Sequence, residues 1–119
     1  LRDVVVVLMI EKQSAVEQLE DILAVPGIDM IQWGPADYSM SIGRPGDWNA
    51  ADIKATERKV VETALRMGIP ARAEIDSMEE AKYHLDMGVR HFCIGTDISI
   101  LYDWWKENGA SLRTAISDA

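Results

Sequence analysis

The sequence contains little cysteine and little basic charge, and each scarcity excludes a class of protein. Cys93 is the only cysteine among the 119 residues, so an internal disulfide and a thiolate metal site of the zinc-ribbon kind are both excluded. Twelve Lys and Arg residues stand against twenty Asp and Glu residues, which gives a net charge of −8. This chain has no basic surplus for a phosphate backbone or an anionic membrane. We therefore expect no nucleic acid and no membrane as partners.

Long hydrophobic runs are also absent from the sequence. The longest one, Val4–Ile10, is far below the roughly 20 residues that a membrane span needs. A content of 48% hydrophobic and 27% charged residues, with 8 Gly and 4 Pro, is typical of a soluble globular domain. We expect one domain over residues 1–119, in a cytoplasmic protein. Because the chain opens at Leu1, almost at once inside an apolar run, we also expect it to be a piece of something longer.

Strand-like and helix-like segments alternate four times along the chain. Val4–Ile10 is a continuous β-branched run, which is typical of a parallel strand buried on both faces. Similar strands are predicted at 28–33, 70–75 and 89–94, and a long Gly- and Pro-containing loop follows the second. Capping boxes at Ser14 with Glu17 and at Ser77 with Glu80 predict two helix starts. Helices are also predicted to begin near Asp52 and near Ile98, the last with a break at Asn108-Gly109.

This alternation predicts an α/β fold with a parallel sheet and right-handed crossovers. Two architectures accept four such units: an open doubly wound sheet, or half of a (β/α)₈ TIM barrel. The first strand is as apolar as a central strand, and this favours four parallel βα units that form the C-terminal half of a barrel. In that case the strands lie in sequential order, with Glu11, Asp37, Glu74 and Asp97 near the carboxyl edge. Both architectures place ligands at that edge.

Two carboxylates follow the first two predicted strands. Glu11 ends an all-apolar strand and shares the face of Met9, where a carboxylate is expensive to desolvate without a partner. Asp37 follows the second strand, and neighbouring strands lie about 4.8 Å apart. The two side chains can therefore converge on one hard divalent ion such as Mg²⁺ or Mn²⁺. Two alternatives stay open: Glu11 pairs with a basic side chain, and Asp37 caps its loop.

The turn that carries Asp37 also suits a small anion. It reads Gly34-Pro35-Ala36-Asp37, in which the glycine lets the backbone approach a ligand closely. The backbone amides of Ala36 and Asp37 can face a carboxylate. We therefore expect Gly34, Pro35, Ala36 and Asp37 to bind substrate.

Four motifs together resemble a known family. They are Met9-Ile10-Glu11, Val25-Pro26-Gly27-Ile28-Asp29, Gly34-Pro35-Ala36-Asp37-Tyr38-Ser39 with Gly43, and Ile94-Gly95-Thr96-Asp97. In order and spacing they resemble the C-terminal half of the class II pyruvate aldolases of the HpcH/HpaI family, of the 2,4-dihydroxyhept-2-ene-1,7-dioate aldolase type. The resemblance spans essentially the whole chain.

The resemblance implies a TIM barrel and a metal-dependent carbon–carbon lyase, an aldehyde-lyase. Such an enzyme cleaves 4-hydroxy-2-oxo acids to pyruvate and an aldehyde through a metal-stabilised enolate. The positions that match Glu11 and Asp37 would bind a divalent metal, Mg²⁺ or Mn²⁺, with Co²⁺ as a further option. The amides that match Ala36 and Asp37 would meet the pyruvate carboxylate. A Schiff-base mechanism needs an inward strand lysine, and none of the four predicted strands carries one.

The chain also departs from the family pattern. The family's general-base histidine and its enolate-stabilising arginine lie on the N-terminal half of the barrel, so we assign no catalytic residue here and expect this chain alone to be inactive. His84 and His91 are expected to be structural. Arg72 and Glu74 share one face of a strand, where many relatives are apolar; they either bind a polar aldehyde partner or pair with each other.

Two further expectations concern partners and function. Family members resemble homo-oligomers in which the last helix crosses to a neighbour, so we expect a homo-oligomer, with Trp104 to Ile116 as the exchanged region. The alternative function is a non-catalytic α/β module that binds a small molecule or metal at the same strand ends.

Overall fold

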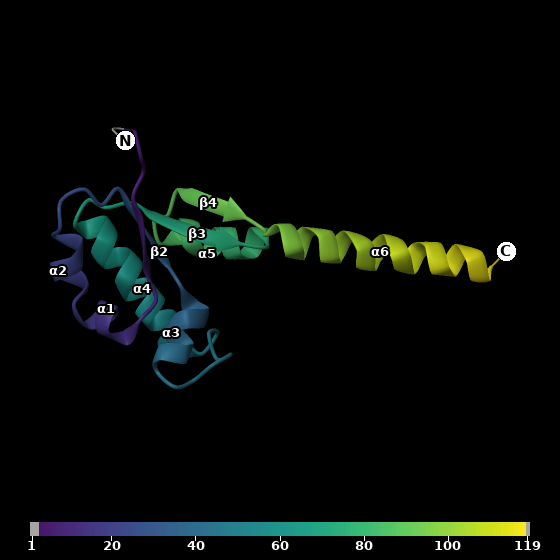
Figure 1. Cartoon of the computed structure of the whole chain (residues 1–119), viewed down its shortest axis with the longest axis horizontal. Helices are drawn as coiled ribbons and strands as arrows, with labels where there is room; N and C mark the ends of the chain where they lie inside the picture. Colours follow the sequence, from purple (N-terminus) through teal and green to yellow (C-terminus); the bar gives the residue numbers. More distant parts are fainter. Residues whose placement is uncertain (1–2, 119) are drawn as a thin grey trace.

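The computed structural model describes residues 3–118 as four strands that alternate with helices (Figure 1). The strands are β1 (Val7–Ile10), β2 (Met30–Trp33), β3 (Ala71–Ile75) and β4 (His91–Ile94). The helices are α1 (Gln13–Glu17), α2 (Leu19–Leu23), α3 (Pro35–Ser41), α4 (Ala51–Arg66), α5 (Met78–Asp86) and α6 (Asp97–Ser117). No helix within residues 3–118 is long and apolar enough to cross a membrane.

The four strands form one parallel sheet in the order β1-β2-β3-β4. Ile10 lies beside Trp33 and Ile31 beside Ala71, while Ile75 lies beside Ile94. A doubly wound sheet reverses direction at a switch point, whereas a barrel adds each strand beside the last. The predicted α/β class with four sequential parallel βα units is therefore confirmed.

One face of the sheet carries the hydrophobic core. Ile31 in β2 is fully buried, as are Val60 and Ala64 in α4. Ala71, Ala73 and Ile75 of β3 face the same core, together with Ile10 at the end of β1. The core therefore lies between the sheet and the helices that cover one of its faces, as is usual in a βα fold.

The other face of the sheet is open. Residues alternate along β3, so that Arg72 and Glu74 are accessible while their neighbours are buried. Met9, on the corresponding face of β1, is 47% exposed, and Val5 is 65% exposed. This open face carries the side chains that would fill the interior of a closed barrel.

Three of the four predicted helix starts are right, those of α4, α5 and α6, and one is wrong. Ser77 is the N-cap of α5, where its side chain accepts from the Glu80 amide, while the Glu80 carboxylate accepts from the Asp76 amide. The predicted Ser14 cap is wrong, because α1 begins two residues earlier, with Lys12 at its N-cap and no side-chain cap bond. The helix is also divided into α1 and α2 at Gln18, whose backbone leaves helical geometry.

The last helix, α6, follows β4 and projects away from the sheet (Figure 1). Thr96 and Ser99 form a reciprocal capping box at the start of α6. The predicted break at Asn108-Gly109 is wrong, because α6 runs without interruption from Asp97 to Ser117. The Asn108 side chain donates to the Trp104 carbonyl within this helix at 2.8 Å. A helix interior tolerates one glycine at a cost of about 1 kcal/mol. None of the residues of α6 is buried, and Trp104 and Trp105 are 54% and 66% exposed.

A buried polar cluster joins α4 to α5. The Glu57 side chain is only 5% exposed and accepts from His84 Nε2 at 3.1 Å and from Lys54 Nζ at 3.0 Å. The Tyr83 hydroxyl donates to the same carboxylate at 3.3 Å. Burial raises the pKa of Glu57, but the hydrogen bonds from His84 and Lys54 outweigh it, so that its pKa is lowered overall. This arrangement agrees with a structural role for His84.

We expect Glu57→Gln to change the pH dependence of stability. The folded pKa lies below the ordinary value of 4.5, so the unfolded chain binds more protons in acid. The stability from ionised Glu57 is complete above the unfolded value and is lost as the pH falls through the folded pKa. At neutral pH the variant should lose about 3 kcal/mol, because the substitution breaks a buried pair. The difference should shrink as the pH falls below the ordinary value of 4.5 and through the lowered pKa of folded Glu57.

Urea unfolding at several pH values measures this effect. Glu62→Gln on the same helix is the matched control, because Glu62 is 56% exposed and pairs with Arg58 at the surface. Parallel stability curves for the unmodified protein and Glu57→Gln would contradict the assignment.

Candidate metal and substrate site

Glu11 is the first residue after β1, and its side chain lies over Gly34 at the end of β2. A Cβ built on Gly34 would stand 2.7 Å from Glu11 Cβ and 3.2 Å from Glu11 Oε2. The Gly34 amide also donates to the Ile10 carbonyl at 3.1 Å, which continues the β1–β2 pairing by one residue. Glycine is therefore required here for space, because any side chain at position 34 would displace the half-buried Glu11.

The turn after β2 continues into a short helix, α3, where the sequence predicted a loop. Gly34 is the N-cap of α3 and Pro35 is its first residue, a position that suits proline because no amide is needed there. The Tyr38 amide donates to the Gly34 carbonyl at 2.9 Å, and the Ser39 hydroxyl donates to the Ala36 carbonyl at 2.7 Å. The amides of the first helical turn have no partner within a helix. Ala36 and Asp37, both exposed, lie in this turn.

The carboxylates of Glu11 and Asp37 make no side-chain hydrogen bond or ion pair within residues 3–118. Neither alternative from the sequence is therefore seen among these residues: Glu11 has no basic partner, and the Asp37 side chain does not cap its loop. The structure places Glu11 against Gly34 and Asp37 three residues farther along the chain, at the same carboxyl edge.

The donor set at this edge fits a hard divalent ion only in part. Glu11 is held over a cradle that a Cβ would fill, and carboxylate oxygens are the ligands that Mg²⁺ and Mn²⁺ prefer. Over residues 3–118, no group of three His, Cys, Asp or Glu side chains could hold a metal ion. Two carboxylates suit an ion that keeps several positions for water or substrate, as Mg²⁺ does.

Arg72 and Glu74 lie on the open face of β3, but Arg72 is engaged mainly with a third residue. Its Nε donates to the Gln32 side-chain oxygen at 2.5 Å, whereas its Nη2 is 4.0 Å from Glu74 Oε1. Gln32 is 2% exposed. Gln32 was not predicted as a site residue, although a polar side chain within an otherwise apolar strand is a signal of a buried polar contact.

A cleft of about 640 Å³ opens at the carboxyl end of β3. It includes Pro35, Arg72 and Glu74 from the predicted site, but not Glu11 or Asp37. Glu11 follows β1, which is the edge strand of the sheet. That side of the site lacks a neighbouring strand within residues 3–118, so no enclosed pocket forms around Glu11.

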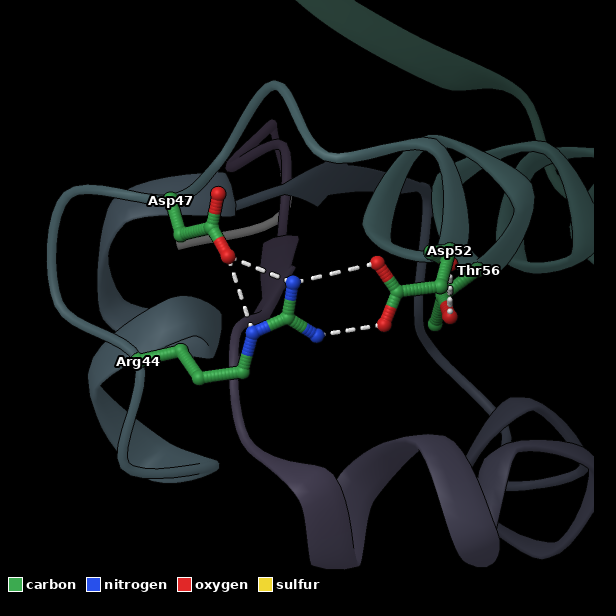
Figure 2. A network of polar contacts seen from close by, with 4 residues as sticks. All are labelled: Arg44, Asp47, Asp52 and Thr56. Carbon is green, nitrogen blue, oxygen red and sulfur yellow. Dashed lines mark hydrogen bonds and ion pairs between the residues drawn. The ribbon is translucent and has the colours of Figure 1, made fainter.

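An ion-pair network holds the loop between α3 and α4 (Figure 2). Arg44 Nε donates to Asp47 at 2.9 Å, and Arg44 Nη2 donates to Asp52 Oδ1 at 3.2 Å. The hydrogen bond from Arg44 lowers the pKa of Asp52. Thr56 donates to the Asp52 carbonyl at 2.9 Å. These contacts tie the loop to the first turn of α4.

Comparison with known proteins identifies the class to which this fold and site belong. Residues 1–100 match the HpcH/HpaI aldolase/citrate lyase family. Hydroxypyruvate/pyruvate aldolase from Paraburkholderia phytofirmans is 34% identical over 92 residues, which are 77% of this chain and 35% of that protein. 5-Keto-4-deoxy-D-glucarate aldolase from Escherichia coli O157:H7 is 24% identical over 99 residues, which are 83% of this chain and 39% of that protein.

Solved structures agree with this fold. An HpcH/HpaI aldolase/citrate lyase family protein from Burkholderia cenocepacia superposes with a TM-score of 0.85 at 25% identity, over 94% of this chain and 44% of that one. Macrophomate synthase, at 22% identity, shares the fold with a TM-score of 0.82, over 97% of this chain and 40% of that one.

The chain belongs to the HpcH/HpaI aldolase/citrate lyase family. Its homologues include pyruvate-type aldolases, which are carbon–carbon lyases. It spans less than half the length of these relatives. The four βα units match part of the barrel structures of the family.

Proposed function

We propose that this chain is the C-terminal half, with strands equivalent to five to eight, of the barrel of a class II pyruvate aldolase. The whole enzyme would cleave a 4-hydroxy-2-oxo acid to pyruvate and an aldehyde. The observation that best supports this proposal is the position of Glu11. Its carboxylate lies over Gly34, at the start of the turn that contains Asp37. The 2,4-dihydroxyhept-2-ene-1,7-dioate type remains a prediction.

Glu11 and Asp37 would hold the divalent ion, Mg²⁺ or Mn²⁺ with Co²⁺ as a further option. When bound, such an ion supplies Lewis-acid polarisation of the keto oxygen, which favours release of the electron pair of the broken carbon–carbon bond toward pyruvate. Two acidic side chains without His or Cys suit these hard ions better than zinc.

The backbone of the Gly34–Asp37 turn would position the 2-oxo acid. Gly34 has no side chain to block the approach of substrate, and Pro35 fixes the start of α3. The amides of Ala36 and Asp37 would donate to the substrate carboxylate, at the positive end of the helix dipole. Arg72 and Glu74, one strand farther along the sheet, would face the aldehyde half of the substrate.

Proton removal from the 4-hydroxyl group is assigned to the other half of the barrel. His84 is enclosed between α4 and α5, with Nδ1 2.9 Å from the Glu80 carbonyl and Nε2 on Glu57. His91 is the first residue of β4 and lies beside Arg72 in the β3–β4 register, two residues before Cys93, which pairs with Glu74. We expect both histidines to be structural and assign neither as the general base.

We expect Gly34→Ala to weaken metal binding. The new Cβ would stand 2.7 Å from Glu11 Cβ, so Glu11 must move and its carboxylate with it. Loss of a well-placed ligand should lower the Mn²⁺ affinity about 10- to 100-fold, as displaced supporting groups do in metal sites. Isothermal titration with Mn²⁺ measures this.

Gly109→Ala is the matched control. Gly109 lies within α6, where a Cβ would approach only Arg113 at 3.9 Å, and alanine is the better helix former. This variant should bind Mn²⁺ as the unmodified protein does. Equal Mn²⁺ affinity of Gly34→Ala and Gly109→Ala would reject Glu11 as a ligand.

The chain is also expected to associate, as a homo-oligomer or with its missing half. Strands β1 and β4 are open edges, and the apolar residues of α6, among them Trp104, Trp105, Leu112 and Ile116, are exposed. Such surfaces are association sites. Sedimentation velocity at micromolar concentration should show a dimer or larger species, with Trp104 to Ile116 exchanged between copies. A stable monomer would contradict this expectation.

A further inference from the structure

The open face of the sheet carries a guanidinium group that is held in a fixed position. Arg72 lies beside Gln32 in the β2–β3 register, and Gln32 lies beside Met9 in the β1–β2 register. Arg72 Nε donates to the Gln32 side-chain oxygen at 2.5 Å, while Gln32 itself is 2% exposed. A buried amide that lacked this partner would be costly. The pair is therefore a specific device that orients Arg72.

The rest of the guanidinium is available to a ligand. Within residues 3–118, Nη1 and Nη2 of Arg72 donate no hydrogen bond, and the nearest ion-pair contact is Glu74 Oε1 at 4.0 Å. The Arg72 side chain is 38% exposed, and Arg72 is one of the residues at the cleft at the carboxyl end of β3. An oriented guanidinium with two accessible nitrogens matches a carboxylate, which it binds through two parallel hydrogen bonds.

The position of Arg72 relative to Glu11 indicates which carboxylate it meets. Glu11 lies over Gly34, and Gly34 is two residues beyond Gln32 on the same strand. Two residues along a strand span about 7 Å. Arg72 is thus one row of side chains away from the proposed metal, on the neighbouring strand. The amides of Ala36 and Asp37 already serve the carboxylate of the 2-oxo acid, so Arg72 faces a second one.

We propose that Arg72, positioned by Gln32, is the specificity-determining residue that binds a carboxylate on the aldehyde partner. This inference rests on the proposed function and adds the residue that would recognise a carboxylate on the second substrate. The chain has a net charge of −8, and Glu11, Asp37 and Glu74 make the site itself acidic. An anionic aldehyde would therefore need a cation at the site, and Arg72 supplies one.

The test uses two aldehydes of matched size in a complete barrel that contains this chain. Glyoxylate carries a carboxylate, and glycolaldehyde carries a neutral hydroxymethyl group in its place. The unmodified protein should prefer glyoxylate in the condensation with pyruvate. Arg72→Met should lower kcat/KM for glyoxylate about 10- to 100-fold through KM, and that for glycolaldehyde less than about threefold, because only the first loses a charged hydrogen bond. Arg66→Met, which removes an exposed charge on α4, should leave both unchanged.

Two further variants separate orientation from folding. Gln32→Met keeps the volume but removes the acceptor for Arg72, and it should raise KM for glyoxylate without raising KM for glycolaldehyde. Arg72→Lys keeps the charge without the planar fork, and its KM for glyoxylate should lie between those of the unmodified protein and Arg72→Met. If Gln32→Met does not fold, the Arg72→Lys and Arg72→Met series still decides the assignment.

Each outcome has one meaning. An equal fall for both aldehydes in Arg72→Met, or a rise in the KM for pyruvate instead, would overturn the assignment of Arg72 to the aldehyde. Exchange of the pyruvate methyl protons with deuterium from solvent reports the proposed function alone. Exchange with no loss of glyoxylate preference in Arg72→Met removes only this inference, whereas absence of metal-dependent exchange in the unmodified protein removes the proposed function as well.

Discussion

Glu11→Gln and Asp37→Asn, each in a complete barrel that contains this chain, are expected to lower turnover of 4-hydroxy-2-oxo acids by about 1,000-fold or more. Each change replaces a carboxylate with a neutral amide of nearly the same shape, so the packing over Gly34 is preserved while a charged ligand is lost. Transition-state charge stabilisation by a metal contributes several kcal/mol, and each 1.36 kcal/mol is a factor of ten in rate. Steady-state kinetics at a fixed Mn²⁺ concentration measure the effect.

Glu107→Gln is the control for the loss of one negative charge. Glu107 is exposed on α6, far along the chain from both strand ends. Its turnover should equal that of the unmodified protein. If Glu11→Gln and Asp37→Asn also retain full turnover, the carboxylates do not bind a catalytic metal.

The 119-residue chain alone is expected to show negligible retro-aldol activity. The residues at its carboxyl edge would bind a metal and a 2-oxo acid, but none is placed to remove the hydroxyl proton. Loss of a general base typically costs about 10²- to 10⁴-fold in rate. Addition of the missing N-terminal strands should restore pyruvate release, which a coupled lactate dehydrogenase assay measures. Robust pyruvate release by the chain alone would show that the base lies within it.

The restored activity should be insensitive to borohydride. None of the strands β1 to β4 carries a lysine that could form a Schiff base with the keto group. Inactivation by borohydride in the presence of substrate would show that the reaction proceeds through such an intermediate after all.

The strands were predictable because each one is a short segment, apolar or alternating, that is bounded by glycine, proline or polar residues. Val7–Ile10 and Ala71–Ile75 differ from their predicted ranges only at the ends. Alternation of strand and helix then leaves few topologies, and the sequential order followed from the apolar first strand. Parity separates Ile10, which is buried, from Met9 on the other face of β1. The prediction that this strand is buried on both faces is wrong, because Met9 is 47% exposed.

Several local features were not predictable because they depend on contacts between distant residues. The helix α3 was hidden by Gly34 and Pro35, which the sequence analysis interpreted as loop residues although they begin a helix. The helix α6 continues through Asn108-Gly109, although this pair is a common helix-ending signal in a sequence. The Gln32–Arg72 hydrogen bond joins residues 40 positions apart and requires the β2–β3 register.

The candidate site was predictable in part. Spacing placed Glu11 and Asp37 at adjacent strand ends, and the structure has Glu11 beside the Gly34 turn. The spacing did not predict that Glu11 occupies the space in which a Cβ of residue 34 would lie. This close contact explains why residue 34 is a glycine. Within residues 3–118, no group of three His, Cys, Asp or Glu side chains could hold a metal ion.

Calorimetric titration of a complete barrel with Mn²⁺ tests the central claim most directly, since it asks whether Glu11 and Asp37 bind one ion together. We predict one Mn²⁺ per chain in the unmodified protein and at least a 100-fold weaker affinity in the Glu11→Gln, Asp37→Asn double variant, because both charged ligands are lost. The Glu107→Gln control should bind as the unmodified protein does. Unchanged stoichiometry and affinity in the double variant would contradict the account.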